Sequence, residues 1–324
     1  MTRARASLIL GLKILITVIP CYFVFHNILK TPGMDSGDFQ SLIRSIRYTP
    51  LFFAVLCLFL STLSGCVQWR LLLRKQNIEM GYLKLLKIYY VGLFFNNFMP
   101  GNVGGDLKKI YDIRVGTEET VGAAVSATVF DRLFGLYFLN VFALVVGFLF
   151  FIHDPEQRYF WIPSFWVFVG FTVFQIALFS RRFSRLISKI AVKILPQKWG
   201  DRFCHLQERF HAFRDLKLWI AITFLSGITQ TLRVLVHFCC GIALGLDIAV
   251  SWYFYYIPMI AVISALPISI GGFGPRELLA QTLFARAGVG TMESVMVQLL
   301  AYLAGLLLSL VGAFEFLRRR KSVK

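Results

Sequence analysis

The sequence predicts an all-α integral membrane protein with about six spanning helices and two oppositely oriented re-entrant helical hairpins, arranged as an inverted repeat. Of its 324 residues, 57% are hydrophobic and 16% are charged. A soluble domain has about half apolar and a quarter charged residues. The mean hydropathy is +0.68, and runs of about 20 nearly uncharged residues recur, each long enough to cross a hydrocarbon core of roughly 30 Å.

Six apolar runs give the expected spanning helices. They are residues 7–27, 51–69, 133–152, 161–180, 218–244 and 295–317. Most of the 34 Lys and Arg residues lie between alternate spans and at the two ends of the chain. This positive-inside bias predicts a multi-pass protein of the inner or plasma membrane with both termini in the cytoplasm. The net charge of +17 is therefore mainly topological, and we expect no nucleic-acid partner.

Two further apolar stretches, at about 82–111 and 251–289, do not fit the pattern of simple spans. They contain FFNNFMPGNVGGD and ALPISIGGFGPRE, whose Pro and Gly residues break helices. Cationic residues flank the first stretch on both sides, so we expect it to enter and leave on the cytoplasmic face. The second follows a span that leaves the cytoplasm, so we expect it to dip in from the outer face.

The two stretches share a P-x3-G-G pattern, in Pro100-x3-Gly104-Gly105 and Pro267-x3-Gly271-Gly272. The offset in sequence between these two patterns also carries the spans that flank the first pattern onto the spans that flank the second. This predicts inverted repeat halves at about 51–152 and 218–317 within one transmembrane domain, 1–324. The alternative is that the pattern arose twice in a Gly-rich chain. Between the halves, 181–217 is expected to form a cytoplasmic linker with an amphipathic helix on the leaflet, its apolar side including Phe210 and Phe213.

Ionisable groups at membrane depth are functional candidates, because burying a charge there costs about 2.5–3.5 kcal/mol on insertion scales. Arg233 lies about 22 Å along its helix from Lys217, so it needs a carboxylate partner or a phosphate. Arg276 follows the second Pro-Gly break. The candidate lipid-binding residues are Asn96, Asn97, Pro100, Gly104, Gly105, Asp106, Asp131, Arg132, Gln230, Arg233, Pro267, Ser269, Gly271, Gly272, Gly274, Arg276 and Glu277.

These residue types are typical of a ligand-binding site and not of a catalytic site. Arg233 and Arg276 offer planar forks for phosphate, and the Gly-rich turns offer backbone N–H groups to an anion. Asp106, Asp131 and Glu277 would balance the cations or recognise a cationic headgroup. The structural alternative has Asn96 and Asn97 satisfying broken-helix backbone and Asp131–Arg132 forming an interfacial pair. We expect no catalytic residue, no metal and no cofactor, because the sequence lacks hydrolase, nucleotide-binding and metal-ligand spacings.

The stretches FFNNFMPGNVGGDLKKIYDIR, DRLFG (131–135) and ALPISIGGFGPRE resemble the transmembrane domain of the lysylphosphatidylglycerol synthase/flippase family, over essentially the whole chain. The resemblance implies a membrane domain that translocates a phospholipid, with aminoacyl transfer belonging to a separate soluble domain. We expect no such synthase domain in these 324 residues. A synthase name would therefore not make the chain an enzyme.

The sequence thus predicts a flippase-like lipid translocase that moves a phospholipid or another polar headgroup between leaflets. The expected partners are membrane lipids, anionic or aminoacylated. A homodimer and a separate synthase subunit remain open as protein partners. The alternatives are the membrane part of a lipid-modifying transferase (aminoacyl or glycosyl) and a scaffold that does not transport.

Overall fold

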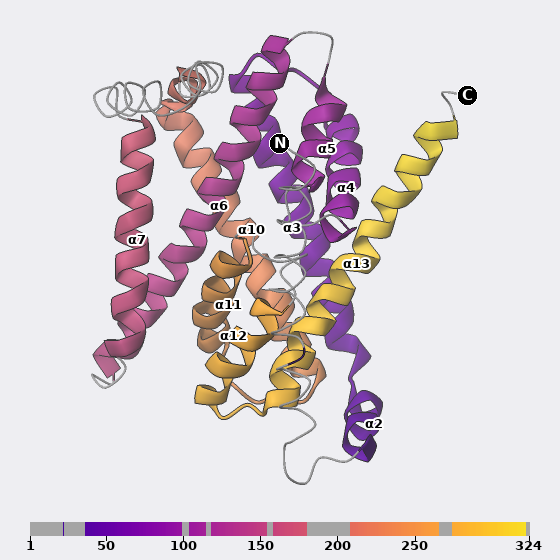
Figure 1. Ribbon diagram of the computed structural model, residues 1–324, viewed down its shortest axis with the longest axis vertical. Coiled ribbons are helices and arrows are strands. Elements are labelled where there is room, and N and C mark those ends of the chain that lie inside the picture. The colour runs from indigo at the N-terminus through magenta and orange to yellow at the C-terminus, as the bar shows by residue number, and fades with distance from the viewer. Residues whose placement is uncertain are drawn as a thin grey trace, which may run out of the picture. The chain divides into compact units, whose positions relative to one another are not determined.

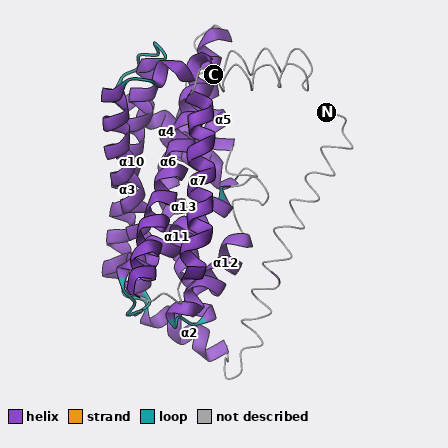
Figure 2. Ribbon diagram, turned by 90° about the vertical axis from the view of Figure 1, so that its left-hand side faces the viewer, coloured by secondary structure: helices purple, strands orange, loops and turns teal. Residues whose placement is uncertain are grey.

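The computed structural model describes Tyr22 and residues 36–98, 104–114, 118–153, 158–179, 208–265 and 274–321. In these ranges all regular structure is helical (Figure 1), and Figure 2 shows helices joined by loops with no strand among the described residues. The prediction of an all-α protein is confirmed.

Ten α-helices and two 3-10 turns make up the described chain. The α-helices are α2 (Ser36–Ser45), α3 (Tyr48–Lys75), α4 (Tyr82–Phe98), α5 (Gly104–Ile113), α6 (Glu118–His153), α7 (Arg158–Phe179), α10 (Leu216–Ala243), α11 (Val250–Ser264), α12 (Pro275–Phe284) and α13 (Thr291–Lys321). The 3-10 turns are His211–Phe213 and Ala285–Ala287.

Four of the described helices are long and apolar enough to cross a membrane: Tyr48–Lys75, Val121–His153, Leu216–Ala243 and Thr291–Arg319. They coincide with four of the six predicted spans. The run predicted at 161–180 lies in α7, in which the shorter segment Trp161–Ile176 is apolar and described in full. The run predicted at 7–27 lies outside the described residues, apart from Tyr22.

Helix α6 begins much earlier than the predicted span at 133–152. It starts at Glu118, because the Ala- and Val-rich residues 120–130 are uncharged and compatible with helix. Asp131 and Arg132 therefore lie inside a continuous helix and do not open the span as predicted.

The chain forms two compact units that interleave in the sequence. Unit 1 comprises residues 1–61, 90–107 and 231–324, and unit 2 comprises residues 62–89 and 108–230. Each unit draws on segments from both predicted repeat halves. Helices α3, α4, α5 and α10 contribute residues to both units.

Unit 1 is built around α11, α12 and α13. Tyr253 and Tyr256 of α11 contact the Phe284 ring of α12, with ring centroids 5.3 Å and 5.2 Å apart. These three side chains are almost fully buried. Figure 1 shows α12 beside both α11 and the first turns of α13. Large aromatic residues thus fix the two helices on either side of the second predicted break.

Unit 2 has its own aromatic core, where the chain entering α10 packs on α6. The Phe130 ring stacks on Phe213 at 4.8 Å, and Trp219 lies edge-on to Phe134 at 5.4 Å. Phe210 and Phe213 are 2% and 0% exposed. The sequence predicted both residues on the lipid-facing side of an amphipathic helix. That placement is wrong for these two side chains, because the rings of α6 and α10 bury them.

A helix ends before each P-x3-G-G pattern, and the next helix begins at Gly104 within the first pattern and at Pro275 after the second. Helix α4 ends at Phe98 and α5 begins at Gly104, while α11 ends at Ser264 and α12 begins at Pro275. The backbone of Gly274 has a φ of +87°, which favours glycine, and Pro275 occupies the first position of α12, where its missing N–H costs nothing. That each helical pair enters and leaves the membrane on one side stays a prediction.

Cysteine labelling in intact cells tests this topology. In a Cys-less background, we expect Gly101→Cys to be modified only from the cytoplasmic side and Gly272→Cys only from the outer side, because flanking charges orient the hairpins oppositely. Cysteines introduced at Asn77 and Asp154 serve as inner and outer references. Modification of both glycine positions from the same face would contradict the inverted repeat.

Candidate functional site

The second break carries a buried ion pair in unit 1. Glu277 Oε2 accepts a hydrogen bond from the Gly274 N–H at 2.8 Å, which caps the start of α12. Glu277 Oε1 accepts bonds from Arg276 Nε at 3.0 Å and Nη2 at 2.5 Å. The two side chains are 15% and 5% exposed. Arg276 and Glu277, both predicted site residues, therefore act together and fix each other's orientation.

The Arg276 guanidinium also contacts α13. Its central carbon lies 5.5 Å from the centre of the Tyr302 ring, within cation–π range. A planar guanidinium over an aromatic face keeps its outer N–H groups directed around the ring edge. Arg276 is thus held from two sides, by a carboxylate and by a ring.

At the first break, the two predicted asparagines have different roles. Asn96 Oδ1 accepts a hydrogen bond from the backbone N–H of Gly105 at 2.8 Å, so it satisfies the start of α5. Asn96 therefore has the alternative, structural role, in which its side chain satisfies the backbone of a broken helix. Asn97 instead reaches another helix, where its Nδ2 donates to Ser309 Oγ of α13 at 2.9 Å. A Cβ atom on Gly105 would overlap the Gly92 carbonyl oxygen, so this position requires glycine.

Asp106 also belongs to unit 1 and lies in the first turn of α5, where a carboxylate favours the positive end of the helix dipole. It is 8% exposed, and Gly104 and Gly105 beside it are buried. The remaining residues of the two predicted turns, Pro100, Pro267, Ser269, Gly271 and Gly272, lie outside the described residues.

One face of α13 receives both groups of contacts. Gln298, Tyr302, Gly305, Ser309 and Gly312 follow each other at alternating intervals of four and three, the spacing of a single helical stripe. Tyr302 receives Arg276 and Ser309 receives Asn97. Polar residues from the two helical breaks therefore meet the same side of one helix within unit 1.

Gln298 is the least satisfied polar group on this stripe. Gln298 is 1% exposed. In the described part of the chain neither its Oε1 nor its Nε2 makes a hydrogen bond of normal geometry, although its side chain lies close to that of His237. Buried carboxamides are nearly always paired, because an unpaired polar group costs about 1–3 kcal/mol. Gln298 was not among the predicted residues. The available signal was a carboxamide within an apolar run.

Arg233 is placed differently from Arg276. It is exposed on α10, and among the described residues no carboxylate pairs with its guanidinium. Its backbone carbonyl lies 3.1 Å from His237 Nδ1. No described side chain is therefore the anionic partner expected for Arg233, and a phosphate partner stays a prediction.

In unit 2, a hydrogen-bond network crosses three helices. Gln68 of α3 donates from Nε2 to Asp131 Oδ1 of α6 at 2.8 Å, and its Oε1 accepts from Ser226 Oγ of α10 at 2.7 Å. One turn along, Thr229 donates to Ser64 Oγ at 3.0 Å. Asp131 was predicted, whereas Gln68 and Ser226 were missed, although polar residues four or three apart within apolar helices were visible in the sequence.

Gln230 adjoins this network, again in unit 2. It is 4% exposed and its Oε1 has no partner among the described residues. Its Nε2 would lie 2.8 Å from a Cβ atom on Gly135, so glycine makes room for the carboxamide. Arg132 is half-buried beside Asp131 on α6. Of the predicted residues, unit 2 thus contains Asp131, Arg132 and Gln230.

From the sequence, Lys109 was one of the cationic residues that flank the first apolar stretch. In the structure it belongs to unit 2 and is only 6% exposed. Its Nζ lies 5.0 Å from the Trp69 ring centre and 4.7 Å from that of Tyr89. Trp69 is itself fixed by a bond from Nε1 to Thr128 Oγ1 at 3.1 Å. Two aromatic faces thus replace part of the water around this ammonium. No sequence signal separated Lys109 from its neighbour Lys108.

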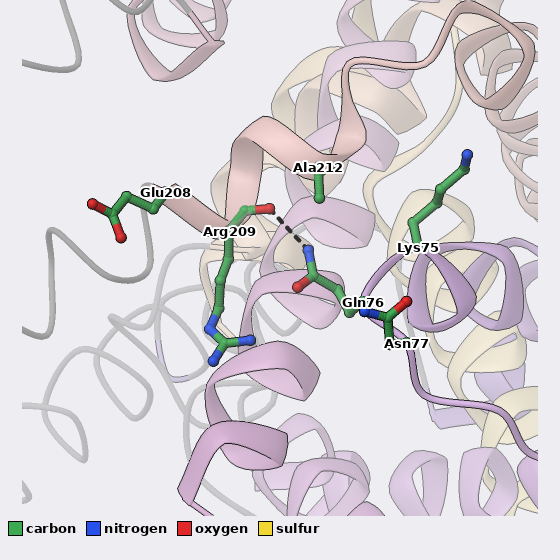
Figure 3. Close-up of a pocket in the computed structure, with 6 residues that line it drawn as sticks. All are labelled: Lys75, Gln76, Asn77, Glu208, Arg209 and Ala212. Carbon is green, nitrogen blue, oxygen red and sulfur yellow. Dashed lines mark hydrogen bonds between the residues drawn. The ribbon is translucent and has the colours of Figure 1, made fainter.

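An open cleft of about 340 Å³ lies at the C-terminal end of α3 in unit 2 (Figure 3). It is lined by Lys75, Gln76, Asn77, Glu208, Arg209 and Ala212. Gln76 Nε2 donates to the Arg209 carbonyl at 2.9 Å, which joins two of the lining residues (Figure 3). Lys75 pairs with Asp215, and this hydrogen bond lowers the pKa of the Asp215 carboxyl. Both partners are well exposed, so the pair contributes little to stability.

Within the described ranges, no three His, Cys, Asp or Glu side chains gather as metal ligands. The donor groups that converge are instead carboxamides, hydroxyls and cations. Such groups can form hydrogen bonds to polar or anionic ligands.

Comparison with known proteins identifies the family. Residues 9–312 match the family described as the lysylphosphatidylglycerol synthase TM region. The chain is 24% identical to a UPF0104 membrane protein of Methanothermobacter thermautotrophicus, with 93% of each chain covered. It is also 24% identical to a UPF0104 membrane protein of Pyrococcus horikoshii, over 84% of this chain and 87% of that one.

The family match covers nearly the whole chain, and the described residues provide several membrane-length apolar helices. Together they make this a multi-pass membrane protein. The resemblance found in the sequence motifs is confirmed. The chain belongs to the lysylphosphatidylglycerol synthase transmembrane-region family.

Proposed function

We propose that the protein is a lipid translocase that lets a polar headgroup pass between leaflets while the acyl chains stay in lipid. The observation that carries the proposal is the stripe on α13 in unit 1. Arg276 from the second break contacts Tyr302, Asn97 from the first break bonds Ser309, and buried Gln298 keeps an open donor and acceptor. Polar groups from both breaks are thus available along a single helix.

The physical need for such a stripe is large. Moving a bare charge into hydrocarbon costs on the order of tens of kcal/mol by the idealised Born argument. Fixed hydrogen-bonding groups reduce this cost by replacing water around the headgroup. From Gln298 to Ser309 the stripe extends about 16 Å at 1.5 Å per residue, which is roughly half the hydrocarbon thickness.

Within this proposal the charged residues have separate roles. Arg276, held by Glu277 and Tyr302, offers its guanidinium to a headgroup phosphate, and Arg233 is the second phosphate ligand. Asp106, which lies in the same unit, balances these cations or binds a cationic headgroup. The backbone of the Gly-rich turns gives the close approach that an anion needs.

The proposal includes the topology and partners expected from the sequence. The two helical pairs are re-entrant hairpins of opposite orientation, and both termini lie in the cytoplasm of an inner or plasma membrane. The substrate is an anionic or aminoacylated phospholipid. Inverted repeats in transporters place the site near the midplane, and the stripe from Gln298 to Gly312 lies near the middle of the membrane-length segment Thr291–Arg319.

A liposome assay tests the function directly. The purified full-length protein is reconstituted with a lipid labelled on its headgroup, and leaflet exchange is measured by quenching of the outer label. We expect faster exchange than in protein-free liposomes, with lipid mass unchanged. A change in lipid mass in the presence of an aminoacyl or glycosyl donor would instead favour a transferase. If neither lipid exchange nor a change in lipid mass is observed, the scaffold that does not transport is the remaining alternative.

A further inference from the structure

We propose that His237 of α10 takes up a proton when a headgroup phosphate binds Arg276, so that lipid binding in unit 1 is coupled to protons. The inference rests on the translocase proposal, which places the phosphate at Arg276, and it adds the ion that binds with the lipid. His237 lies in the membrane-length segment Leu216–Ala243 and is half-buried. Imidazole is the side chain whose charge ordinarily changes between about pH 5 and 8.

The backbone of α10 fixes which ring nitrogen of His237 carries the hydrogen. His237 Nδ1 lies 3.1 Å from the carbonyl oxygen of Arg233, one turn earlier. A carbonyl oxygen only accepts, so Nδ1 is the donor in this bond. In the neutral ring Nε2 is then bare, and it is the atom that a proton would occupy. Protonation therefore adds a donor at Nε2 and leaves the bond at Nδ1 in place.

The side chain that approaches His237 from α13 is Gln298. It is 1% exposed, and among the described residues neither its Oε1 nor its Nε2 makes a hydrogen bond of normal geometry. A carboxamide has a donor and an acceptor, and rotation about its terminal torsion exchanges them. Gln298 can therefore donate to a bare Nε2 or accept from a protonated one. A buried carboxamide without a fixed partner thus suits both protonation states of the ring.

The nearest charged groups of unit 1 are two arginines and one carboxylate. The Arg276 guanidinium of α12 lies within electrostatic range of the His237 ring, and it donates to Glu277 Oε1. Arg233 lies one turn before His237 on α10 itself. The single carboxylate is therefore already bonded to one of the two arginines, and a proton on His237 would add a third positive charge.

Two other helices contact this part of α10 through groups that stay neutral near pH 7. The Cys57 thiol of α3 contacts the Cys239 thiol, and the Tyr253 ring of α11 lies 5.5 Å from that of Phe238. Thiols and phenols ordinarily lose their protons above about pH 8. Among these groups, the one whose charge changes near pH 7 is therefore His237.

A phosphate at Arg276 changes the balance of charge. Two positive charges, on Arg276 and on a protonated His237, repel each other unless an anion lies beside them. A bound phosphate supplies that anion, so lipid and proton each strengthen the binding of the other by the same factor. The proton comes from water and joins Nε2, no bond of the lipid breaks, and no electrons are transferred. The lipid should bind more tightly at low pH and more weakly as the pH rises.

The test uses full-length protein in a nonionic detergent at constant ionic strength. The ligand is dihexanoyl phosphatidylglycerol, whose phosphodiester stays ionised throughout this pH range, and dihexanoyl glycerol is the control without phosphate. The rise of the unfolding midpoint with ligand concentration gives the apparent Kd at each pH, and a pH indicator in weakly buffered solution reports the protons taken up. From about pH 5 to about pH 8 we expect the affinity to fall about tenfold or more, with proton uptake on binding.

His153→Gln is the matched control for His237→Gln. His153 Nδ1 lies 2.8 Å from the Leu149 carbonyl one turn earlier, as His237 does from Arg233, but His153 is exposed and belongs to unit 2. We expect His237→Gln to abolish proton uptake and to bind lipid at every pH as weakly as the wild type does at high pH. His153→Gln should keep the pH dependence. If His237→Gln does not fold, His237→Asn replaces it, and the uptake by the wild type needs no variant.

The outcomes separate this inference from the translocase proposal. Lipid binding without proton uptake in the wild type, or uptake that persists in His237→Gln, would overturn the role of His237 and leave the translocase intact. Proton-coupled binding that depends on His237 but is not accompanied by lipid exchange in liposomes would support His237 and refute the translocase. No binding of the phosphate lipid at any pH would overturn the phosphate site and the role of His237 with it.

Discussion

Replacing Gly312 by alanine should separate α13 from α4 and sharply reduce the amount of folded protein. A Cβ atom at this position would overlap the backbone carbonyl of Tyr90 and lie 2.9 Å from the Val91 nitrogen. Backbone atoms cannot move away as a flexible side chain can. Overpacking a close contact costs about 1–3 kcal/mol, and a clash with backbone should reach or exceed the upper value. The measurements are yield after extraction and the thermal unfolding midpoint.

Gly305→Ala is the matched control for that change. Gly305 lies seven residues earlier on the same stripe of α13, and its added Cβ would meet only the Leu58 Cδ2 at 3.8 Å, an ordinary contact. Both substitutions raise helix propensity equally. We therefore expect Gly305→Ala to fold as the wild type or slightly better. Equal stability of the two variants would show that close approach of α4 and α13 at Gly312 is not required.

The sequence was most informative where a property is local. Long uncharged runs predicted membrane-length helices because span length follows from bilayer thickness. The bounds of α10 and α13 lie within four residues of the predicted ones, whereas α3 continues six residues past its predicted end. Pro-Gly clusters predicted the helix interruptions, because these residues disfavour helix wherever they occur. The start of α6 was missed, since Ala- and Val-rich residues before Asp131 are compatible with either a helix or a loop.

The partners of the polar residues could not be predicted in the same way. Nothing within the first hairpin sequence distinguishes Asn96, which caps α5, from Asn97, which bonds Ser309 more than 200 residues later. Lys109 and Lys108 are adjacent and chemically identical, but only Lys109 is enclosed by Trp69 and Tyr89. These differences depend on which helices pack together. Single-helix periodicity does not contain that information.

The Arg276 series is expected to have the largest effect on transport. In the wild type, Arg276 Nε and Nη2 both donate to Glu277 Oε1 and the guanidinium lies over the Tyr302 ring. Arg276→Lys keeps the positive charge but loses this planar group. Lysine offers a single ammonium and stacks less well on a ring. We expect lipid exchange per folded molecule to fall about tenfold or more, the effect of losing one charge-assisted hydrogen bond to phosphate. The unfolding midpoint should change little.

Arg276→Ala should differ in kind, because it leaves Glu277 as a buried carboxylate without its cation. Removing one partner of a buried pair costs about 3–5 kcal/mol, so this variant should lose stability as well as exchange. Arg286→Lys, at an exposed arginine in the turn after α12, is the matched control and should change neither property. A purely structural Arg276 predicts another order, in which Arg276→Ala lowers yield and stability while exchange per folded molecule stays normal in both variants.

Normal exchange in Arg276→Lys would remove this guanidinium from the headgroup path. The phosphate would then have to bind Arg233 or the backbone N–H groups of the Gly-rich turns, since Gln298 and Ser309 on the stripe, and Asn97 of α4 beside it, are uncharged.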